Sequence, residues 1–405
     1  MTRLPDTEWL NDPAFRKVVD SLRVDGAPPR IVGGAVRDAL LGLAVSDVDL
    51  ATPLLPEDIV QRLEAARIKA VPTGIDHGTI TAVSDGRTFE ITTLRRDVET
   101  DGRRATVAFS SDWQEDAARR DFTINALYAD PDDGKIIDYF GGLADLESGL
   151  VRFIGDAGQR IAEDHLRILR LFRFHARFGK GPIDPDALSA ARANASKLMA
   201  LSRERIADEL RKLLAVTNPA PVVSAMVDAD IFSAFLPELA TGAALRLARL
   251  VDREHTADIA PLAVRRLSAL LPTDPMLVEK IAARLKLSNR MRADLAVLAK
   301  TDHGVTTARQ LAYRLGTGNA RSHILLHHGD EGLGEALEAL HGWEPPQLPI
   351  KGGDLIEMGM RQGPMVARTL QAIERQWIEE NFPTQSRTRE IAERLVAEAL
   401  GSMPG

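Results

Sequence analysis

The hydrophobic and polar positions change their period near residue 150. Before it, short apolar runs and alternating positions are typical of strands, which we expect over Asp47–Ala51, Gly78–Ser84, Thr88–Leu94 and Ile136–Phe140. After it, apolar residues recur every three or four positions, the period of an amphipathic helix, and one long helix is expected over Ala157–Phe178. The pattern predicts a mixed α/β head followed by an all-α remainder.

The same change of pattern gives the expected domain organisation. At roughly 150 residues per domain, a chain of 405 residues has room for two or three domains. We expect a head over residues 1–150, a neck over 151–215, a helical body over 216–345 and a helical tail over 346–405.

Composition narrows the chemistry that the chain can perform. Cysteine is absent, which excludes thiol catalysis, disulfides and thiolate metal sites. No apolar run approaches the about 18 residues of a membrane-spanning helix, and the polar N-terminus lacks the order of a signal peptide. We therefore expect a cytoplasmic protein with no membrane partner. The net charge of −7 argues against non-specific coating of nucleic acid, whereas local arginine-rich segments stay compatible with an RNA partner.

Two glycines before an expected helix form the first candidate for chemistry. Gly33 and Gly34 precede the helical run Val36–Leu43. Glycines at this place let an anion approach the free backbone N–H groups of the first helical turn. For a double glycine by itself, a tight turn without a ligand is the alternative interpretation.

Three acidic residues on expected strands form the second candidate. Asp47 and Asp49 are two positions apart, so in an extended strand they point to one face, where two like charges favour a bound cation. Glu90 completes a three-carboxylate cluster if its strand lies beside theirs, and an exposed strand residue is the alternative. Carboxylate oxygens suit Mg²⁺, and three carboxylates can hold two such ions.

Several segments in a fixed order resemble the class II family of bacterial tRNA nucleotidyltransferases and poly(A) polymerases. The glycine turn and the acid pair are similar to motif A of this family. The segment that begins at Arg119 is similar to its motif B, and the segment that begins at Glu163 is similar to the nucleotide-selecting motif of its neck. The tail is similar to that of bacterial CCA-adding enzymes more weakly. The segments are Gly33–Gly42, Ser46–Thr52, Arg119–Leu127, Glu163–Arg170 and Ser202–Leu210.

The resemblance implies a polymerase-β-like nucleotidyltransferase head followed by an all-α neck, body and tail, with tRNA bound by the tail. It implies template-independent addition of CCA to the tRNA 3′-end from CTP and ATP, with pyrophosphate released. Asp47, Asp49 and Glu90 would hold Mg²⁺, with no cofactor other than the metal. Contacts with phosphates and ribose are implied for Gly33, Gly34, Arg37, Arg120, Asp121 and Asn125.

The neck segment has a selection logic of its own. On one helix face, Asp164 can accept a base amine and Arg167 can donate to the acceptor beside it. Cytosine and adenine present an amine next to a ring acceptor, whereas uracil and guanine present the reverse, so the pair accepts C and A. Glu163 and Arg170 are expected to hold this pair by charge contacts. A salt-bridged helix face is the alternative interpretation.

Three alternatives to complete CCA addition stay open. They are a poly(A) polymerase, a partial enzyme that adds only CC or only A, and a catalytically inactive RNA-binding protein. The complete set of carboxylates argues against the last of these. We interpret Arg95–Phe109 as a long mobile loop that runs into a short strand. In the family such a loop accompanies the change from C to A addition, which favours complete CCA addition.

Overall fold

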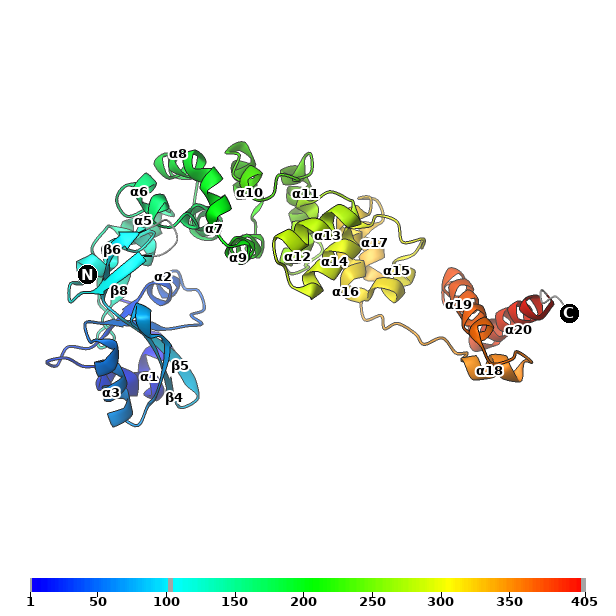
Figure 1. Ribbon diagram of the computed structural model, residues 1–405, viewed down its shortest axis with the longest axis horizontal. Coiled ribbons are helices and arrows are strands. Elements are labelled where there is room, and N and C mark those ends of the chain that lie inside the picture. The colour runs from blue at the N-terminus through cyan, green and yellow to red at the C-terminus, as the bar shows by residue number, and fades with distance from the viewer. Residues whose placement is uncertain (1, 101–104, 402–405) are drawn as a thin grey trace. The chain divides into compact units, whose positions relative to one another are not determined.

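The protein is described by a computed structural model that covers residues 2–100 and 105–401. The chain divides into two units, Met1–Pro237 and Glu238–Gly405 (Figure 1). The first contains the mixed sheet, and the described residues of the second form helices, as the sequence pattern predicts. The finer boundaries at residues 150, 215 and 345 stay a prediction.

A seven-stranded mixed sheet forms the centre of the head. Its strand order is β3-β4-β5-β2-β1-β8-β9. Strands β2 and β5 run parallel, and the other neighbouring pairs are antiparallel. All four expected strands are present, but β2 begins at Asp49, so Asp47 lies in the preceding connection. The strands are β1 (Arg30–Val32), β2 (Asp49–Thr52), β3 (Lys69–Gly74), β4 (Thr79–Ser84), β5 (Arg87–Thr93), β8 (Leu127–Ala129) and β9 (Ile136–Asp138).

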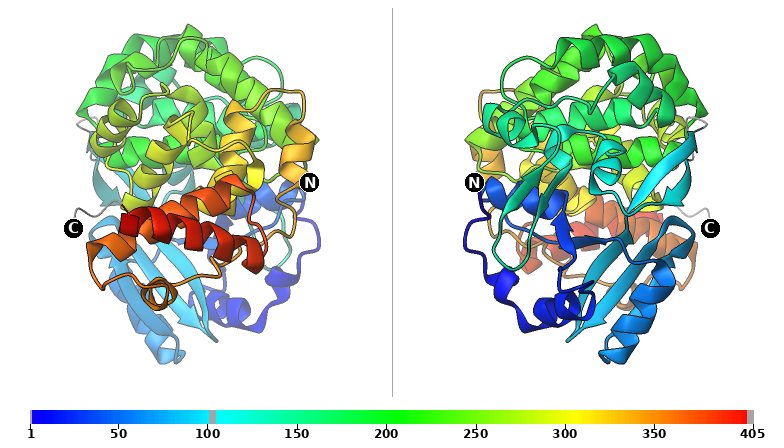
Figure 2. Two further views of the ribbon diagram at one scale, coloured as in Figure 1. Left: turned by 90° about the vertical axis from the view of Figure 1, so that its right-hand side faces the viewer. Right: turned by 90° about the vertical axis from the view of Figure 1, so that its left-hand side faces the viewer.

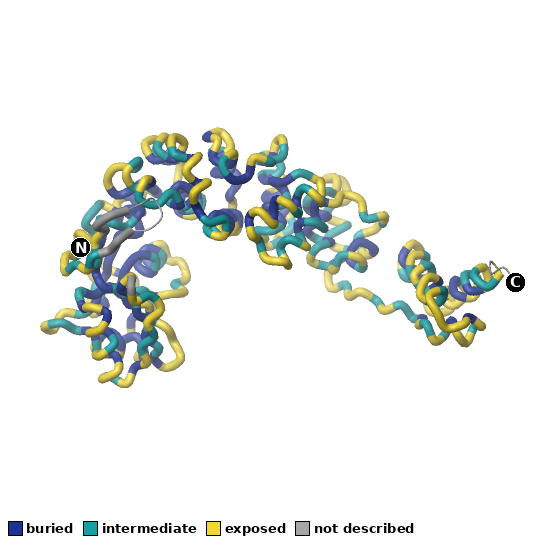
Figure 3. The backbone as a smooth tube through the Cα atoms, viewed as in Figure 1, coloured by how far each residue is buried: buried dark blue, intermediate teal, exposed yellow. Residues whose placement is uncertain are grey.

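The apolar face of the sheet is covered by α1 (Pro13–Ser21) and α3 (Pro56–Ala65). Alternation along β5 buries Phe89 and Ile91, and the Phe15 ring of α1 packs 5.8 Å from the Phe89 ring. The central strands are among the buried segments in Figure 3. The opposite face of the sheet carries the polar residues of the alternation, and Asp49 and Glu90 lie on this face.

The expected long neck helix is broken in two, which corrects the prediction for Ala157–Phe178. Helix α6 (Ala157–Glu163) ends where Asp164 adopts extended backbone with φ −148° and ψ 108°, and α7 (Arg167–Phe178) follows. The Asp164 carboxylate accepts the N–H of Leu166 at 3.0 Å. This local bond competes with the helical ladder. The apolar periodicity continues on both sides of this short turn, and for that reason the sequence pattern did not predict the break.

The segment expected as a mobile loop contains regular structure. Strands β6 (Arg95–Thr100) and β7 (Ala105–Phe109) pair antiparallel as a separate two-stranded sheet. The loop prediction is therefore wrong for β6, whereas β7 confirms the short strand expected at the end of this segment, and residues 101–104 lie outside the described residues. The first unit also contains the helices α2 (Gly34–Leu40), α4 (Trp113–Ala118), α5 (Gly142–Ser148), α8 (Pro185–Asn194), α9 (Arg203–Leu214) and α10 (Ala220–Asp228).

The regular structure of the second unit consists of helices, within its described residues. Its last two long helices, α19 and α20, lie side by side (Figure 2) and share one apolar core. None of the helices described combines the length and apolarity needed to cross a bilayer. The helices are α11 (Ala243–Thr256), α12 (Ala263–Leu270), α13 (Pro275–Arg284), α14 (Asn289–Ala299), α15 (Ala308–Leu315), α16 (Thr317–His327), α17 (Leu333–Glu338), α18 (Gly352–Glu357), α19 (Pro364–Glu379) and α20 (Gln385–Gly401).

Candidate active site

The turn before α2 brings backbone and arginine side chains together. Gly33 has a φ of +70°, a conformation that favours glycine, and α2 begins at the next residue. A Cβ on Gly33 would lie 3.4 Å from Nη1 of Arg120, so this guanidinium sits directly against the turn. Arg37 of α2 is buried and donates to Oδ1 of Asn125 and, at 2.8 Å, to Oδ1 of Asp38.

Asp49 and Glu90 are directly paired across the parallel strands β2 and β5. Their side chains therefore project from the same face of the sheet. Burial raises the pKa of Asp49 to about 6; the charges of Glu90 and Asp47 act in the same direction, whereas that of Arg120 opposes them. Asp47 is exposed in the connection before β2, where it accepts the Ser46 hydroxyl at 2.8 Å.

The chemistry of these acids fits a divalent cation. Among the described residues, the carboxylates of Asp49 and Glu90 make no hydrogen bond or ion pair with the protein, and the Arg120 charge offsets their repulsion only in part. Within residues 2–100 and 105–401, no three His, Asp or Glu side chains already converge as a set of metal ligands. Two neighbouring carboxylates nevertheless suit Mg²⁺, which usually keeps waters and substrate phosphates as its other ligands.

A chain of polar contacts connects the neck with the glycine turn. Arg170 of α7 donates from Nε to Asp121 at 2.7 Å, and Nδ2 of Asn125 donates to the same carboxylate at 2.9 Å. Burial alone would raise the pKa of Asp121, but the Arg170 charge and the Asn125 hydrogen bond lower it below its ordinary value. Asp121 thus accepts hydrogen bonds from Arg170 and Asn125, and Asn125 in turn accepts one from Arg37.

Sequence reasoning missed one residue of this region, Asp116 of α4. Its side chain is 1% exposed and accepts hydrogen bonds from Nε of Arg119 at 3.0 Å and from Nη2 of Arg120 at 3.1 Å. The hydroxyl of Tyr128 donates to it at 2.7 Å. The available signal was an acid three and four positions before two arginines. That spacing is just as usual on a solvated helix face, and only the fold shows that this acid is buried.

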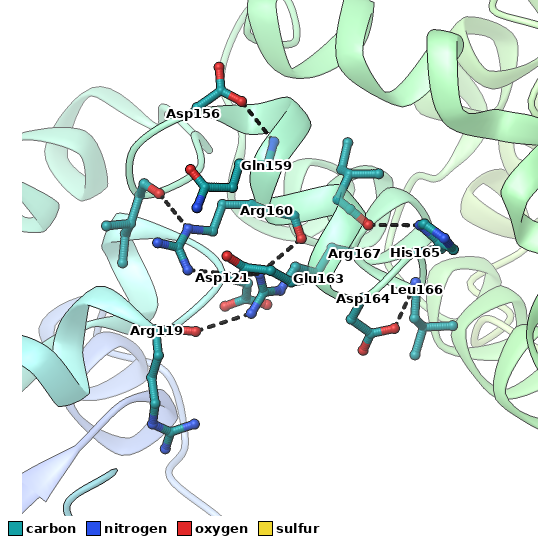
Figure 4. A network of polar contacts seen from close by, with 12 residues as sticks. Arg119, Asp121, Asp156, Gln159, Arg160, Glu163, Asp164, His165, Leu166 and Arg167 are labelled. Atoms are coloured by element: carbon teal, nitrogen blue, oxygen red, sulfur yellow. Dashed lines mark hydrogen bonds and ion pairs between the residues drawn. The ribbon is translucent and has the colours of Figure 1, made fainter. Parts of the chain in front are cut away.

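Arg167 is held in place by contacts on both sides of its guanidinium (Figure 4). Nη1 donates to the Glu163 carboxylate and, at 2.9 Å, to the carbonyl of Arg160, and Nη2 donates to the carbonyl of Arg119 at 3.1 Å. The contact between Glu163 and Arg167 agrees with the expected charge pairing. It fixes the guanidinium between the neck and the head.

Asp164 makes its contacts away from Arg167. Its carboxylate turns toward the N–H of Leu166 (Figure 4) and pairs with Nη2 of Arg205 at 2.6 Å. Because the helix is broken at Asp164, the two residues do not share one continuous helix face, which corrects that part of the prediction. Arg170 was expected to hold this pair by charge contacts. Its hydrogen-bonded partner is Asp121, while its charge also interacts with that of Asp164.

The mixed sheet, the glycine turn and the paired acids define a nucleotidyltransferase head. Residues 29–152 match the family model described as the poly A polymerase head domain, and residues 182–242 match the model of a probable RNA- and SrmB-binding site of polymerase A. Proteins of this class generally depend on a divalent metal ion.

Comparison with whole proteins identifies the family within the nucleotidyltransferase class. The chain is 36% identical over 369 residues to the mitochondrial CCA tRNA nucleotidyltransferase 1 of Danio rerio, covering 86% of this chain and 83% of that one. It is 33% identical to the CCA-adding enzyme of Limosilactobacillus fermentum, covering 90% and 92%. The crystal structure of the Bacillus stearothermophilus CCA-adding enzyme in complex with CTP matches with a TM-score of 0.75 and 29% identity, covering 96% and 100%. The chain belongs to the CCA tRNA nucleotidyltransferase family.

Proposed function

We propose that this protein adds CCA to the 3′-end of tRNA, using CTP and ATP and releasing pyrophosphate. The observation that carries the proposal is the direct pairing of Asp49 with Glu90 on the open face of the sheet. Family membership and the complex of a relative with CTP support the choice of nucleotide.

In this proposal, Asp49 and Glu90, with Asp47 at the rim, hold Mg²⁺. The metal, when bound, lowers the pKa of the tRNA 3′-hydroxyl and neutralises triphosphate charge. Asp49 loses its proton more readily once a cation stands beside it, because its raised pKa comes from burial and from neighbouring negative charge. The ion would thus supply the positive charge beside the two carboxylates that no ion pair with the protein supplies.

The triphosphate is assigned to the glycine turn and its two arginines. The N–H of Gly33 donates to the Leu127 carbonyl at 3.0 Å, so the phosphate is assigned to the N–H groups of the first turn of α2, which begins at Gly34, and Arg120 lies against that turn. Arg37 is fixed from behind by Asn125 and Asp38. A guanidinium that is already oriented loses little freedom when it receives a phosphate.

Base selection is assigned to Asp164 and Arg167. Arg167 is anchored by Glu163, whereas Asp164 is paired with Arg205. An incoming base amine must therefore share or displace the Arg205 contact. Cytosine and adenine offer such an amine beside a ring acceptor, and uracil does not.

Nucleotide incorporation on tRNA transcripts that end before C, after C and after CC tests the proposal. With CTP and ATP together, all three transcripts should end in CCA. With CTP alone the first should gain two residues, and with ATP alone only the last should be extended. A ladder of A residues would instead indicate a poly(A) polymerase, and arrest after CC or inactivity before CC would indicate a partial enzyme.

Cell fractionation tests the predicted cytoplasmic location separately.

A further inference from the structure

Asp116 is the buried carboxylate on which both arginines before Asp121 converge. Oδ2 accepts from Nη2 of Arg120 at 3.1 Å and from the Tyr128 hydroxyl at 2.7 Å. Oδ1 accepts from Nε of Arg119 at 3.0 Å and from the backbone N–H of Arg95 at 3.3 Å. Two donors on each oxygen leave Asp116 no capacity for substrate.

The charge of Asp116 is secured by the same contacts. Burial alone would raise its pKa, but the charges of Arg120 and Arg119 and the hydrogen bond from Tyr128 lower the pKa below its ordinary value. Asp116 is therefore an anion at neutral pH. A charge-assisted hydrogen bond from a fixed anion orients a guanidinium more firmly than a neutral acceptor can.

Arg120 lies between Asp116 and the candidate metal site. Nη2 is bound to Asp116, while Nη1 lies against the turn, 3.4 Å from the position of a Cβ on Gly33. The Arg120 charge also reaches Asp49, whose pKa it lowers, yet the described residues contain no ion pair between the two. If Arg120 were released from Asp116, the carboxylates of Asp49 and Glu90, which have no ion-pair partner among the described residues, would be its next partners.

We propose that Asp116 is a positioning residue that fixes Arg120 beside the glycine turn and keeps it from pairing with Asp49. Arg120 is then available to the triphosphate, and the acids stay available to the metal. This inference rests on the proposed function, because it assigns Arg120 to the nucleotide. Asp116 itself touches neither substrate nor metal.

Steady-state kinetics of Asp116→Asn test the inference. The amide keeps the size of the side chain and removes the charge. The KM for CTP and the KM for ATP should rise by the same factor, since both nucleotides share the triphosphate. We expect about 10- to 100-fold, the range typical of outer residues that orient a ligand-binding group. The Mg²⁺ concentration needed for half-maximal rate should rise as well, while kcat at saturation changes much less.

A double-mutant cycle with Arg120→Ala separates positioning from general damage. If Asp116 acts through Arg120, Asp116→Asn adds no further loss of CTP affinity in the Arg120→Ala background. Full multiplication of the two losses would overturn the inference, as would unchanged CTP affinity in Asp116→Asn. Asp132→Asn is the matched control, because Asp132 also accepts from two arginines, Arg16 and Arg23, but is exposed. It should leave both KM values unchanged.

Two further measurements keep the test decisive. If thermal unfolding shows that Asp116→Asn does not fold, Tyr128→Phe removes only one donor from Oδ2 and should give a smaller rise in the same KM values. Unchanged values in folded Tyr128→Phe would then contradict the inference. Equilibrium binding of CTP is measured beside incorporation. Wild-type protein that binds CTP without extending tRNA would refute the proposed function, while the binding cycle would still decide the role of Asp116.

Discussion

Asp49 and Glu90 stand opposite each other in the parallel register of β2 and β5, on the face of the sheet that the covering helices leave open. Two carboxylates in this relationship repel each other unless a cation intervenes. Their placement therefore costs stability in the metal-free protein and becomes useful when metal and nucleotide arrive.

The substitution Asp49→Asn should stabilise the metal-free protein at pH 8. The folded-state pKa of about 6 lies above the ordinary 3.8, so the folded protein binds this proton more tightly than the unfolded chain. The stabilising contribution of the protonated group is complete below pH 3.8 and is lost as the pH rises through 6. Denaturant unfolding in EDTA should show a gain for Asp49→Asn at pH 8 and none near pH 4. Equal stability of the two proteins at pH 8 would show that burial and the charge of Glu90 do not destabilise the ionised Asp49 carboxylate.

Mg²⁺ should raise the melting temperature of the wild type at pH 8, because a ligand that binds only the folded state stabilises it. The shift should shrink below pH 6, where Asp49 takes up a proton in competition with the metal. Differential scanning fluorimetry at stepped Mg²⁺ concentrations measures this. Asp49→Asn serves as the control and should lose most of the shift. A shift of equal size in both proteins would place the metal elsewhere.

Breaking the contact between neck and head at Arg170 should destabilise the first unit. Arg170→Gln leaves the buried Asp121 carboxylate without its charged partner, a loss that typically costs about 3 kcal/mol or more. Arg177→Gln, on the same helix, removes a more exposed pair with Asp38 and should cost about 1 kcal/mol or less. Urea unfolding of both variants measures the difference. Similar costs would show that the buried pair contributes no more than the exposed one.

Arg167 should carry discrimination between bases. Arg167→Ala removes the donor proposed to meet the ring acceptor of cytosine, which is worth about 1–3 kcal/mol per base. The ratio of kcat/KM for CTP to that for UTP should then fall about tenfold or more on tRNA without CCA. Arg177→Gln, further along α7, is the control and should keep the wild-type ratio. An unchanged ratio in Arg167→Ala would remove this residue from selection.

The second unit should lose stability in mild acid through His323. Burial, together with the charge of His327, lowers the pKa of His323 to about 4, against an ordinary value of 6.5. The unfolded chain therefore binds this proton first, so the stabilising contribution is present above pH 6.5 and is lost as the pH falls toward 4. Thermal unfolding of the full chain between pH 7 and pH 4 should show a shallower decline for His323→Gln. An identical decline would assign the acid sensitivity to other groups.

The candidate acids Asp47, Asp49 and Glu90 could be predicted from the sequence, but the buried ion pairs around them could not. Alternation around Glu90 and the two-residue spacing of Asp47 and Asp49 are local signals, which predict a strand at each place but leave open whether the two strands are neighbours. The neighbourhood of Asp49 and Glu90 is confirmed by the register, although Asp47 lies outside the strand. The catalytic roles themselves stay a prediction.

The turn at Asp164 could not be predicted, because one side chain bonding to the N–H of Leu166 outweighs a periodicity that continues past it. The partners of Arg170 were equally beyond reach, since Asp121 is distant in the sequence and is brought near only by the fold. Asp116 shows the same limit, because burial turns an ordinary helical acid into an anchor for two arginines. Short-range periodicity thus predicts elements, whereas ion pairs between elements depend on packing.

The mass of the product made from a tRNA without CCA, with all four nucleoside triphosphates present, shows whether the protein adds CCA. Wild-type protein should add one defined trinucleotide, C, C and A, and then stop, and Asp49→Asn should add nothing while it still binds tRNA. A homopolymer of A, incorporation of U or G at comparable rates, or full activity in Asp49→Asn would contradict the account.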